Sequence, residues 1–185
     1  MHALTAIIAK WADSFALQNG DMKWFSEQWT SSDFLALGVP VNTDMQKDIS
    51  SYETFAQFCL LYTLCHFFPG QRFPLTMKSL SDNTAAEANS NFLFTTKAPL
   101  CFFVERLCML IATVHAELDV SHIAGHTNEL ADRISRLPLD NPLPSDLNAS
   151  DRIRLQLSEI WFPFPEPKVF PKGASVSWKP PKPRF

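Results

Sequence analysis

The stretch QKDISSYETFAQFCLLYTLCHFF, residues 46–68, predicts the longest helix of this chain. Its core-facing residues recur at the three- and four-residue spacing of one helix face. They are Ile49, Tyr52, Ala56, Cys59, Leu60, Thr63 and Phe67. The dipeptide Pro69-Gly70 follows and ends the pattern, because proline cannot continue a helix. A helix with an apolar face of this length needs other elements to cover it.

Shorter patterns on both sides of this helix predict an α/β domain. Asn19-Gly20 separates two short runs and favours a two-residue hairpin turn, since both residues tolerate positive φ. The expected strands are 12–17, 21–26, 73–81 and 118–123, and the expected further helices are 32–37, 84–91, 99–116 and 128–137. The apolar residues of 99–116 predict a helix buried on most sides. Strands that alternate with helices are typical of α/β folds.

The sequence changes character after Leu137, because 10 of the 14 prolines lie between Pro138 and the end. We therefore expect one domain over residues 1–137 and a proline-rich, basic tail over 138–185. One short helix, at about 150–161, is expected inside this tail, with Ser150 as its cap.

Composition excludes several classes of protein and leaves others open. The formal net charge is −3, so a nucleic-acid partner would need a local basic region rather than a whole-molecule field. The most apolar segments, 55–68 and 100–116, fall short of the roughly 18 residues of a membrane span. The four cysteines have neither zinc nor redox spacing, which predicts reduced, mostly buried thiols. Without a secretory signal, we expect an intracellular protein of the cytoplasm or nucleus and no membrane partner.

Three carboxylates fall at informative places in the predicted order. Glu53 lies four residues after Ile49 and so shares the apolar face of the long helix, Asp82 follows a strand, and Asp132 begins the last helix. Carboxylates that converge from separate elements bind Mg²⁺ or Mn²⁺ and support phosphodiester cleavage. Taken singly, each has a structural alternative, namely an edge residue that reaches solvent, a helix cap and a first-turn acid.

Four motifs in this order resemble the RNase H domain of retrotransposon reverse transcriptases. They are W-F-S-E-x-W at 24–29, Y-E at 52–53, S-D-N-x-A-A at 81–86 and H-I-x-G-x-x-N-x-x-A-D-x-x-S-R-L at 122–137. The last motif is the most specific, and the resemblance covers about residues 10–137. The tail is left unexplained by it.

The resemblance implies an RNase H-like fold, a mixed five-stranded sheet flanked by helices, and metal-dependent cutting of the RNA strand of RNA–DNA hybrids. Glu53, Asp82 and Asp132 would then bind Mg²⁺ or Mn²⁺, and His126 would assist catalysis. Asn128 would brace the turn, whereas the strand position of His122 favours a packed or hydrogen-bonded side chain. In an intact element, a polymerase domain would lie upstream.

One departure from the family pattern implies an impaired enzyme and an altered first strand. The family has an aspartate about four residues before the equivalent of Trp11, and Ile7 occupies that place here. A truncated or degenerate copy would show such a change. Two alternatives therefore stay open: a catalytically inactive nucleic-acid-binding or relic module, and a protein whose proline-rich end binds a partner.

Overall fold

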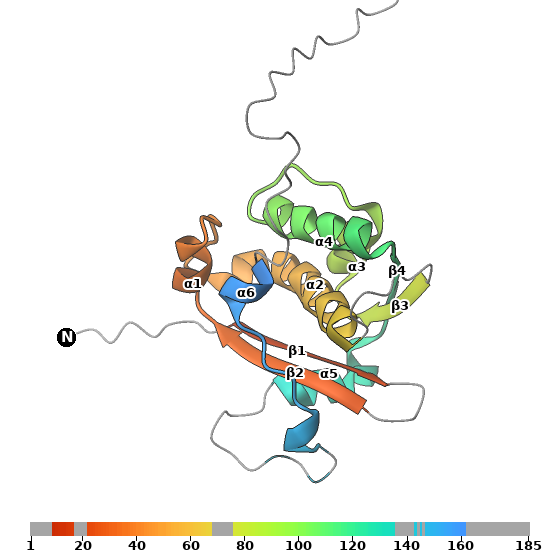
Figure 1. Cartoon of the computed structure of the whole chain (residues 1–185). Coiled ribbons are helices and arrows are strands. Elements are labelled where there is room, and N and C mark those ends of the chain that lie inside the picture. Colours follow the sequence, from red (N-terminus) through yellow and green to blue (C-terminus); the bar gives the residue numbers. More distant parts are fainter. Residues whose placement is uncertain are drawn as a thin grey trace, which may run out of the picture.

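A computed structural model describes residues 9–16, 22–67, 76–135, 143, 145 and 147–161, and the statements below refer to these residues. They form a mixed α/β structure, as expected (Figure 1). The expected Asn19-Gly20 turn, the Pro69-Gly70 helix end and most of the proline-rich tail lie outside them. None of the helices in these ranges is long and apolar enough to cross a membrane.

The order of helices and strands confirms the elements predicted between residues 12 and 137, with ends displaced by up to three residues where both the predicted and the observed end are described. The strands are β1 (Ala9–Ala16), β2 (Met22–Trp29), β3 (Thr76–Ser81) and β4 (Glu117–His122). The α-helices are α1 (Ser31–Ala36), α2 (Ile49–Phe67), α3 (Thr84–Phe92), α4 (Leu100–Val114), α5 (Glu129–Ser135) and α6 (Leu157–Trp161). Single 3-10 turns are Met45–Asp48, Gly125–Thr127 and Ala149–Asp151.

Within the described ranges the strands form two separate pairs. β1 and β2 pair antiparallel, and β3 and β4 pair parallel. The register of the hairpin differs by one residue from the predicted one: Ala16 lies opposite Met22, whereas a two-residue turn at Asn19-Gly20 would place it opposite Lys23. A shift of one residue matters because it exchanges the two faces of a strand.

Helix α2 is the centre of the main core. From Ser51 to Leu61 every side chain except that of Glu53 is buried, so α2 is covered on almost every side. The single apolar stripe predicted from Ile49 onward is therefore wrong at its start, since Ile49 is 45% exposed. Helix α4 is covered on most sides, as predicted: Phe103, Val104, Leu107 and Leu110 are buried, and only Glu105, Ala112 and Thr113 are exposed.

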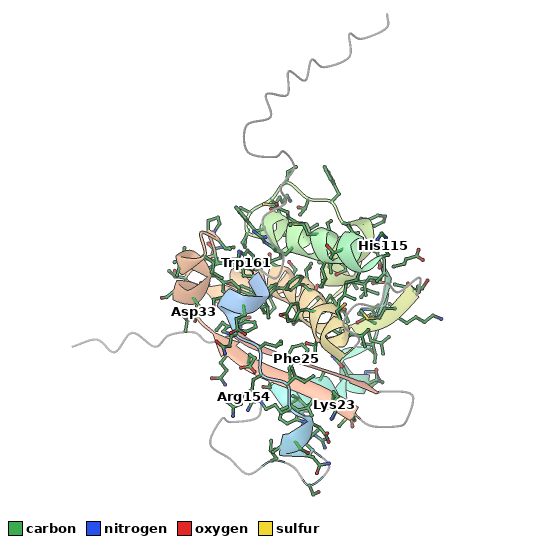
Figure 2. The ribbon with its side chains drawn as sticks, viewed as in Figure 1. Lys23, Phe25, Asp33, His115, Arg154 and Trp161 are labelled. Carbon is green, nitrogen blue, oxygen red and sulfur yellow. The ribbon has the colours of Figure 1, made fainter. Side chains whose placement is uncertain are left out.

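An aromatic cluster joins α2 to its neighbours. Phe55 is fully buried, and its ring centroid lies within 6 Å of rings from four other elements. These rings belong to Trp29 of β2, Phe34 of α1, Phe103 of α4 and Trp161 of α6. Trp161 is labelled in Figure 2, and Arg106 of α4 lies over its ring at 5.0 Å. Elements distant in the sequence thus meet at one residue of α2.

A second, smaller core lies on the other side of the hairpin. Because successive residues of a strand face opposite sides, Phe25 of β2 enters the main core while Trp24 packs with Ile134 of α5 and with Leu147. The hydroxyl of Ser26 also donates to the Ile134 carbonyl oxygen at 3.3 Å. Figure 1 shows α5 beneath the hairpin and α2 above it.

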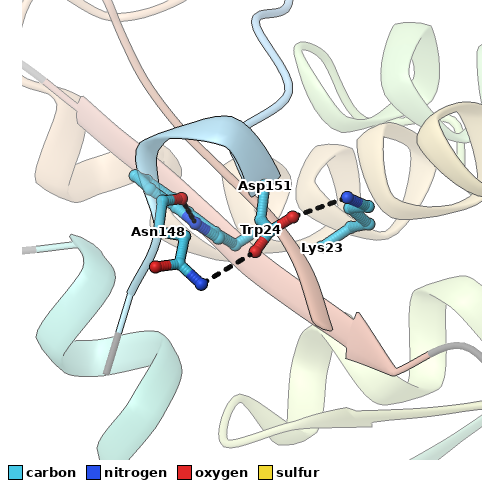
Figure 3. Close-up of polar contacts among 4 residues, drawn as sticks. All are labelled: Lys23, Trp24, Asn148 and Asp151. Atoms are coloured by element: carbon cyan, nitrogen blue, oxygen red, sulfur yellow. Dashed lines mark hydrogen bonds and ion pairs between the residues drawn. The ribbon is translucent and has the colours of Figure 1, made fainter. Parts of the chain in front are cut away.

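Residues 147–161, expected within a proline-rich tail, run along β2 and contribute to both cores. Lys23 pairs with Asp151 at 2.6 Å, and the Trp24 indole nitrogen donates to the Asn148 carbonyl oxygen at 3.1 Å (Figure 3). Asn148 in turn donates to Asp151 at 3.3 Å. In place of the single helix predicted at about 150–161, the segment forms the 3-10 turn Ala149–Asp151 and the separate helix α6.

Arg152 fixes this segment to the outer edge of β2. Its guanidinium donates to the Ser26 carbonyl oxygen at 2.5 Å, lies 3.7 Å from the Glu27 carboxylate and covers the Trp24 ring at 5.6 Å. The backbone nitrogen of Ile153 donates to the Trp24 carbonyl oxygen at 2.8 Å. The outer edge of β2 is thereby covered.

Replacing Phe55 with alanine is expected to destabilise the protein by about 3–5 kcal/mol, because the removed ring leaves a cavity among four elements. The matched control is Phe92→Ala, since the Phe92 side chain is 79% exposed, and it should cost less than about 0.5 kcal/mol. Urea unfolding followed by tryptophan fluorescence measures both. Equal losses in the two variants would contradict the assignment of Phe55 to the centre of the core.

Candidate functional site

The carboxyl end of β3 fixes the backbone around Asp82. The hydroxyl oxygen of Ser81, which is buried, accepts from the Asn83 backbone nitrogen at 3.2 Å. The side chain of Asn83 caps α3 by accepting from the backbone nitrogens of Ala85 and Ala86 at 3.0 and 3.1 Å. Asp82 is exposed between these two fixed residues. Its predicted place at the end of a strand, before a helix cap, is confirmed.

Glu53 lies on α2, near enough to this strand end for its carboxyl group to respond to the charge of Asp82. The preceding residue, Tyr52, is buried in the aromatic cluster against Phe34 and Phe103, which holds this turn of α2 in the core. Burial of the Glu53 carboxyl, and then the negative charge of Asp82, raise the pKa of Glu53 from 4.5 to about 7. The influence of Asp82 means that the two carboxylates, distant in the sequence, lie near each other.

The 3-10 turn Gly125–Thr127 lies beside the carboxylate of Asp82. The backbone nitrogen of Ile123 donates to the Ser81 carbonyl oxygen at 2.9 Å, so the chain that leaves β4 passes the end of β3. A Cβ at Gly125 would lie 3.7 Å from Asp82 Oδ2, which is an ordinary contact, so this place has room for a small side chain. His126 is the next residue and is exposed. The predicted histidine therefore lies in a turn beside Asp82.

Asp132 is held by a different part of the structure. It is exposed on α5, and its backbone nitrogen donates to the Asn128 carbonyl oxygen at 3.1 Å, the first main-chain bond of this helix. Among the residues that the structure describes, no three His, Cys, Asp or Glu side chains lie close enough together to hold a metal ion. The carboxyl groups of Glu53 and Asp82 lie near each other. Neither Asp132 nor His126 joins them to make a group of three possible metal ligands.

The other candidate residues have ordinary environments. His122 ends β4, as predicted, but its side chain is exposed rather than packed. All four cysteines are free thiols; Cys59 is buried, and Cys65, Cys101 and Cys108 are partly buried. Gly125 was not singled out from the sequence, although its place beside Asp82 is consistent with the parallel pairing of β3 with β4. Its place in the H-I-x-G motif is the sequence feature from which Gly125 could have been identified as a residue of the site.

The chemistry of this site follows from two neighbouring carboxyl groups, one partly buried on Glu53 and one exposed on Asp82. Such a pair is stabilised by a proton or by a cation, because either one removes the repulsion between the carboxylates. Carboxylate oxygens are the ligands that Mg²⁺ and Mn²⁺ prefer. The Glu53–Asp82 pair therefore fits the protein side of one hard divalent cation, although two side chains supply only part of a coordination shell.

Comparisons with protein-family models, with curated proteins and with solved structures found no match to this chain.

Substituting Glu53 with glutamine is expected to remove a pH dependence of stability. Because the pKa of Glu53 is raised in the folded state, its protonated form stabilises the fold below pH 4.5, and this contribution is lost as the pH rises to about 7. The Glu53→Gln variant cannot ionise, so at pH 8 without metal it should exceed the wild type by up to about 3 kcal/mol. Urea unfolding at pH 4.5 and pH 8 measures the difference.

The matched control is Glu105→Gln, which changes an exposed glutamate on α4 and should leave the pH dependence intact. Asp82→Asn should lower the pKa of Glu53 without returning it to 4.5, since burial is the larger cause of the shift. If Glu53→Gln and the wild type lose stability in parallel between pH 4.5 and pH 8, the raised pKa is not a property of Glu53.

Proposed function

We propose that this chain is an RNase H-type domain of a retroelement reverse transcriptase, a metal-dependent endonuclease that cuts the RNA strand of RNA–DNA hybrids. The supporting observation is the pair of coupled carboxylates, Glu53 and Asp82, at the carboxyl end of β3 with the His126 turn beside it. These residues belong to three of the four motifs that carry the resemblance. The activity is lowered, because Ile7 stands where the family has its first aspartate.

We also propose that the two strand pairs belong to one mixed sheet, as the five-stranded family fold requires. The outer edges of both pairs are already covered. Ile153 bonds to the outer edge of β2, and the Asn91 side chain bonds to both the nitrogen and the oxygen of Val120, at 2.9 and 2.7 Å, on the edge of β4 that faces away from β3. Among the described strands, β1 and β3 are therefore the ones at which the pairs would join.

Each residue of the site has a definite part in the proposed reaction. Glu53 and Asp82 would hold the cation, and Asp132 is assigned as the third carboxylate by the resemblance alone. When bound, a divalent cation activates water and stabilises charge on the phosphate. By the resemblance, the exposed imidazole of His126, in the turn beside Asp82, would assist catalysis. Hybrid duplexes would be recognised through backbone geometry and the 2′-hydroxyl groups.

Slow cleavage of a labelled RNA–DNA hybrid is expected in Mn²⁺ or Mg²⁺ and none in EDTA. Glu53→Gln and Asp82→Asn should each lower the rate by about 100-fold or more, because each removes a ligand that fixes the cation. Gel analysis of the products measures the rates, and Glu105→Gln is the control with an unchanged rate. If the Asp82→Asn variant cleaves as fast as the wild type, the nuclease proposal fails.

A second candidate is a nucleic-acid-binding module without catalysis. Two observations favour it: Ile7 replaces an expected ligand, and the described residues contain no group of three donors around a metal position. Residues 166–185 contain five basic residues and one acidic residue, which would supply the phosphate contacts. These basic residues are Lys168, Lys172, Lys179, Lys182 and Arg184.

Affinity for a hybrid duplex is expected to fall steeply with salt if the basic residues bind phosphates. Each neutralised phosphate contributes about 0.7–0.9 to the slope of log affinity against log salt. Replacing the five basic residues with glutamine should weaken binding and flatten this slope, as measured by fluorescence anisotropy. A slope that is unchanged in this variant would exclude the tail as the binding region.

A further inference from the structure

Gln57 is a buried amide at the junction of α2 and β3. It lies four residues after Glu53, and its side chain is 3% exposed. Its Oε1 accepts a hydrogen bond from the Ser79 hydroxyl at 2.5 Å, and its Nε2 donates to the Leu80 carbonyl oxygen at 3.4 Å. Both the oxygen and the nitrogen of the amide therefore form hydrogen bonds from α2 to β3, with residues more than twenty positions away in the sequence.

These bonds fix how α2 lies along β3. Apolar side chains in contact tolerate small displacements, whereas a hydrogen bond requires its donor and acceptor to keep a limited range of distance and angle. Ser79 is itself buried, and an unpaired buried hydroxyl or carbonyl costs about 1–3 kcal/mol. One relative position of the helix and the strand is thus favoured over its neighbours.

The same two elements carry the carboxylate pair. Glu53 is one helical turn before Gln57, about 5–6 Å away on the same side of α2. Asp82 follows Leu80 by two residues, about 7 Å along the strand direction. The backbone at Asp82 is tied to β3 and to α3 by the bonds of its neighbours, Ser81 and Asn83. The Gln57 amide is therefore a polar link between the elements that bear Glu53 and Asp82.

We propose that Gln57 is a positioning residue, which sets the separation of the Glu53 and Asp82 carboxylates through its bonds to Ser79 and Leu80. The inference rests on the proposed function, because the separation matters for cation binding. An apolar side chain at this position would fill the space but would leave the partners on β3 unpaired. The amide does not reach the cation and acts only through α2 and β3.

The test is Mn²⁺ binding by the full chain, measured by electron paramagnetic resonance of the free ion, together with urea unfolding. Gln57→Leu removes both hydrogen bonds and is expected to weaken Mn²⁺ binding by about 10- to 100-fold. Ser79→Ala removes one bond and should have a smaller effect. Gln57→Leu combined with Ser79→Ala leaves fewer unpaired groups, so it keeps the test usable if the single variant is unstable.

The matched control is Thr63→Val, on the same helix. Thr63 is fully buried, and its hydroxyl donates to the Cys59 carbonyl oxygen at 2.6 Å within α2, away from the junction with β3. It should lower stability and leave Mn²⁺ affinity unchanged. A Mn²⁺ affinity that is unchanged in Gln57→Leu, or that falls equally in Thr63→Val, overturns the positioning role and leaves the proposed function standing. Absence of Mn²⁺ binding by the wild type overturns both.

Discussion

Contact of the Phe55 ring with its aromatic neighbours is the interaction on which the rest of the structure depends. It brings β2, α1, α4 and α6 to the middle of α2, although these elements are far apart in the sequence. Aromatic pairs at such distances add to the free energy of burying the rings. Because Phe55 lies two residues from Glu53 and two from Gln57, the position of the core also sets the depth at which these polar side chains are held.

Burial of the Glu53 carboxyl group at the candidate site lowers the free energy of unfolding. An apolar residue at position 53 would avoid the penalty of placing a carboxyl beside the charge of Asp82, so the raised pKa of Glu53 reflects an unfavourable arrangement for folding alone. Arrangements of this kind are common where charge is needed for binding or catalysis, although structural networks also produce them. The polar link through Gln57 has the same character, because a buried amide stabilises little in net terms but specifies a geometry.

Much of the fold could be predicted from local patterns, and the failures have identifiable physical causes. The helix at 46–68 and the strand before Asp82-Asn83 were recognisable because periodicity and capping residues are local signals. The burial of α2 on almost every side between Ser51 and Leu61 was not, because it depends on residues 147–161, whose proline-rich context hid their packing. The hairpin register depends on the loop length and on both faces of the sheet. Gln57 lies in an apolar run without any motif, and only the fold gives it partners.

The same reasoning accounts for the incomplete set of carboxylates. Glu53 and Asp82 are attached to elements of the main core, where α2 packs against β3 through Gln57. Asp132 belongs to α5, which is anchored instead to the hairpin by the second core and by the bond from Ser26 to Ile134. The distance of Asp132 from the pair therefore depends on how the hairpin lies relative to β3 and β4. Within the described ranges these strands share no pairing, so strand pairing alone does not fix the place of Asp132 relative to Glu53 and Asp82.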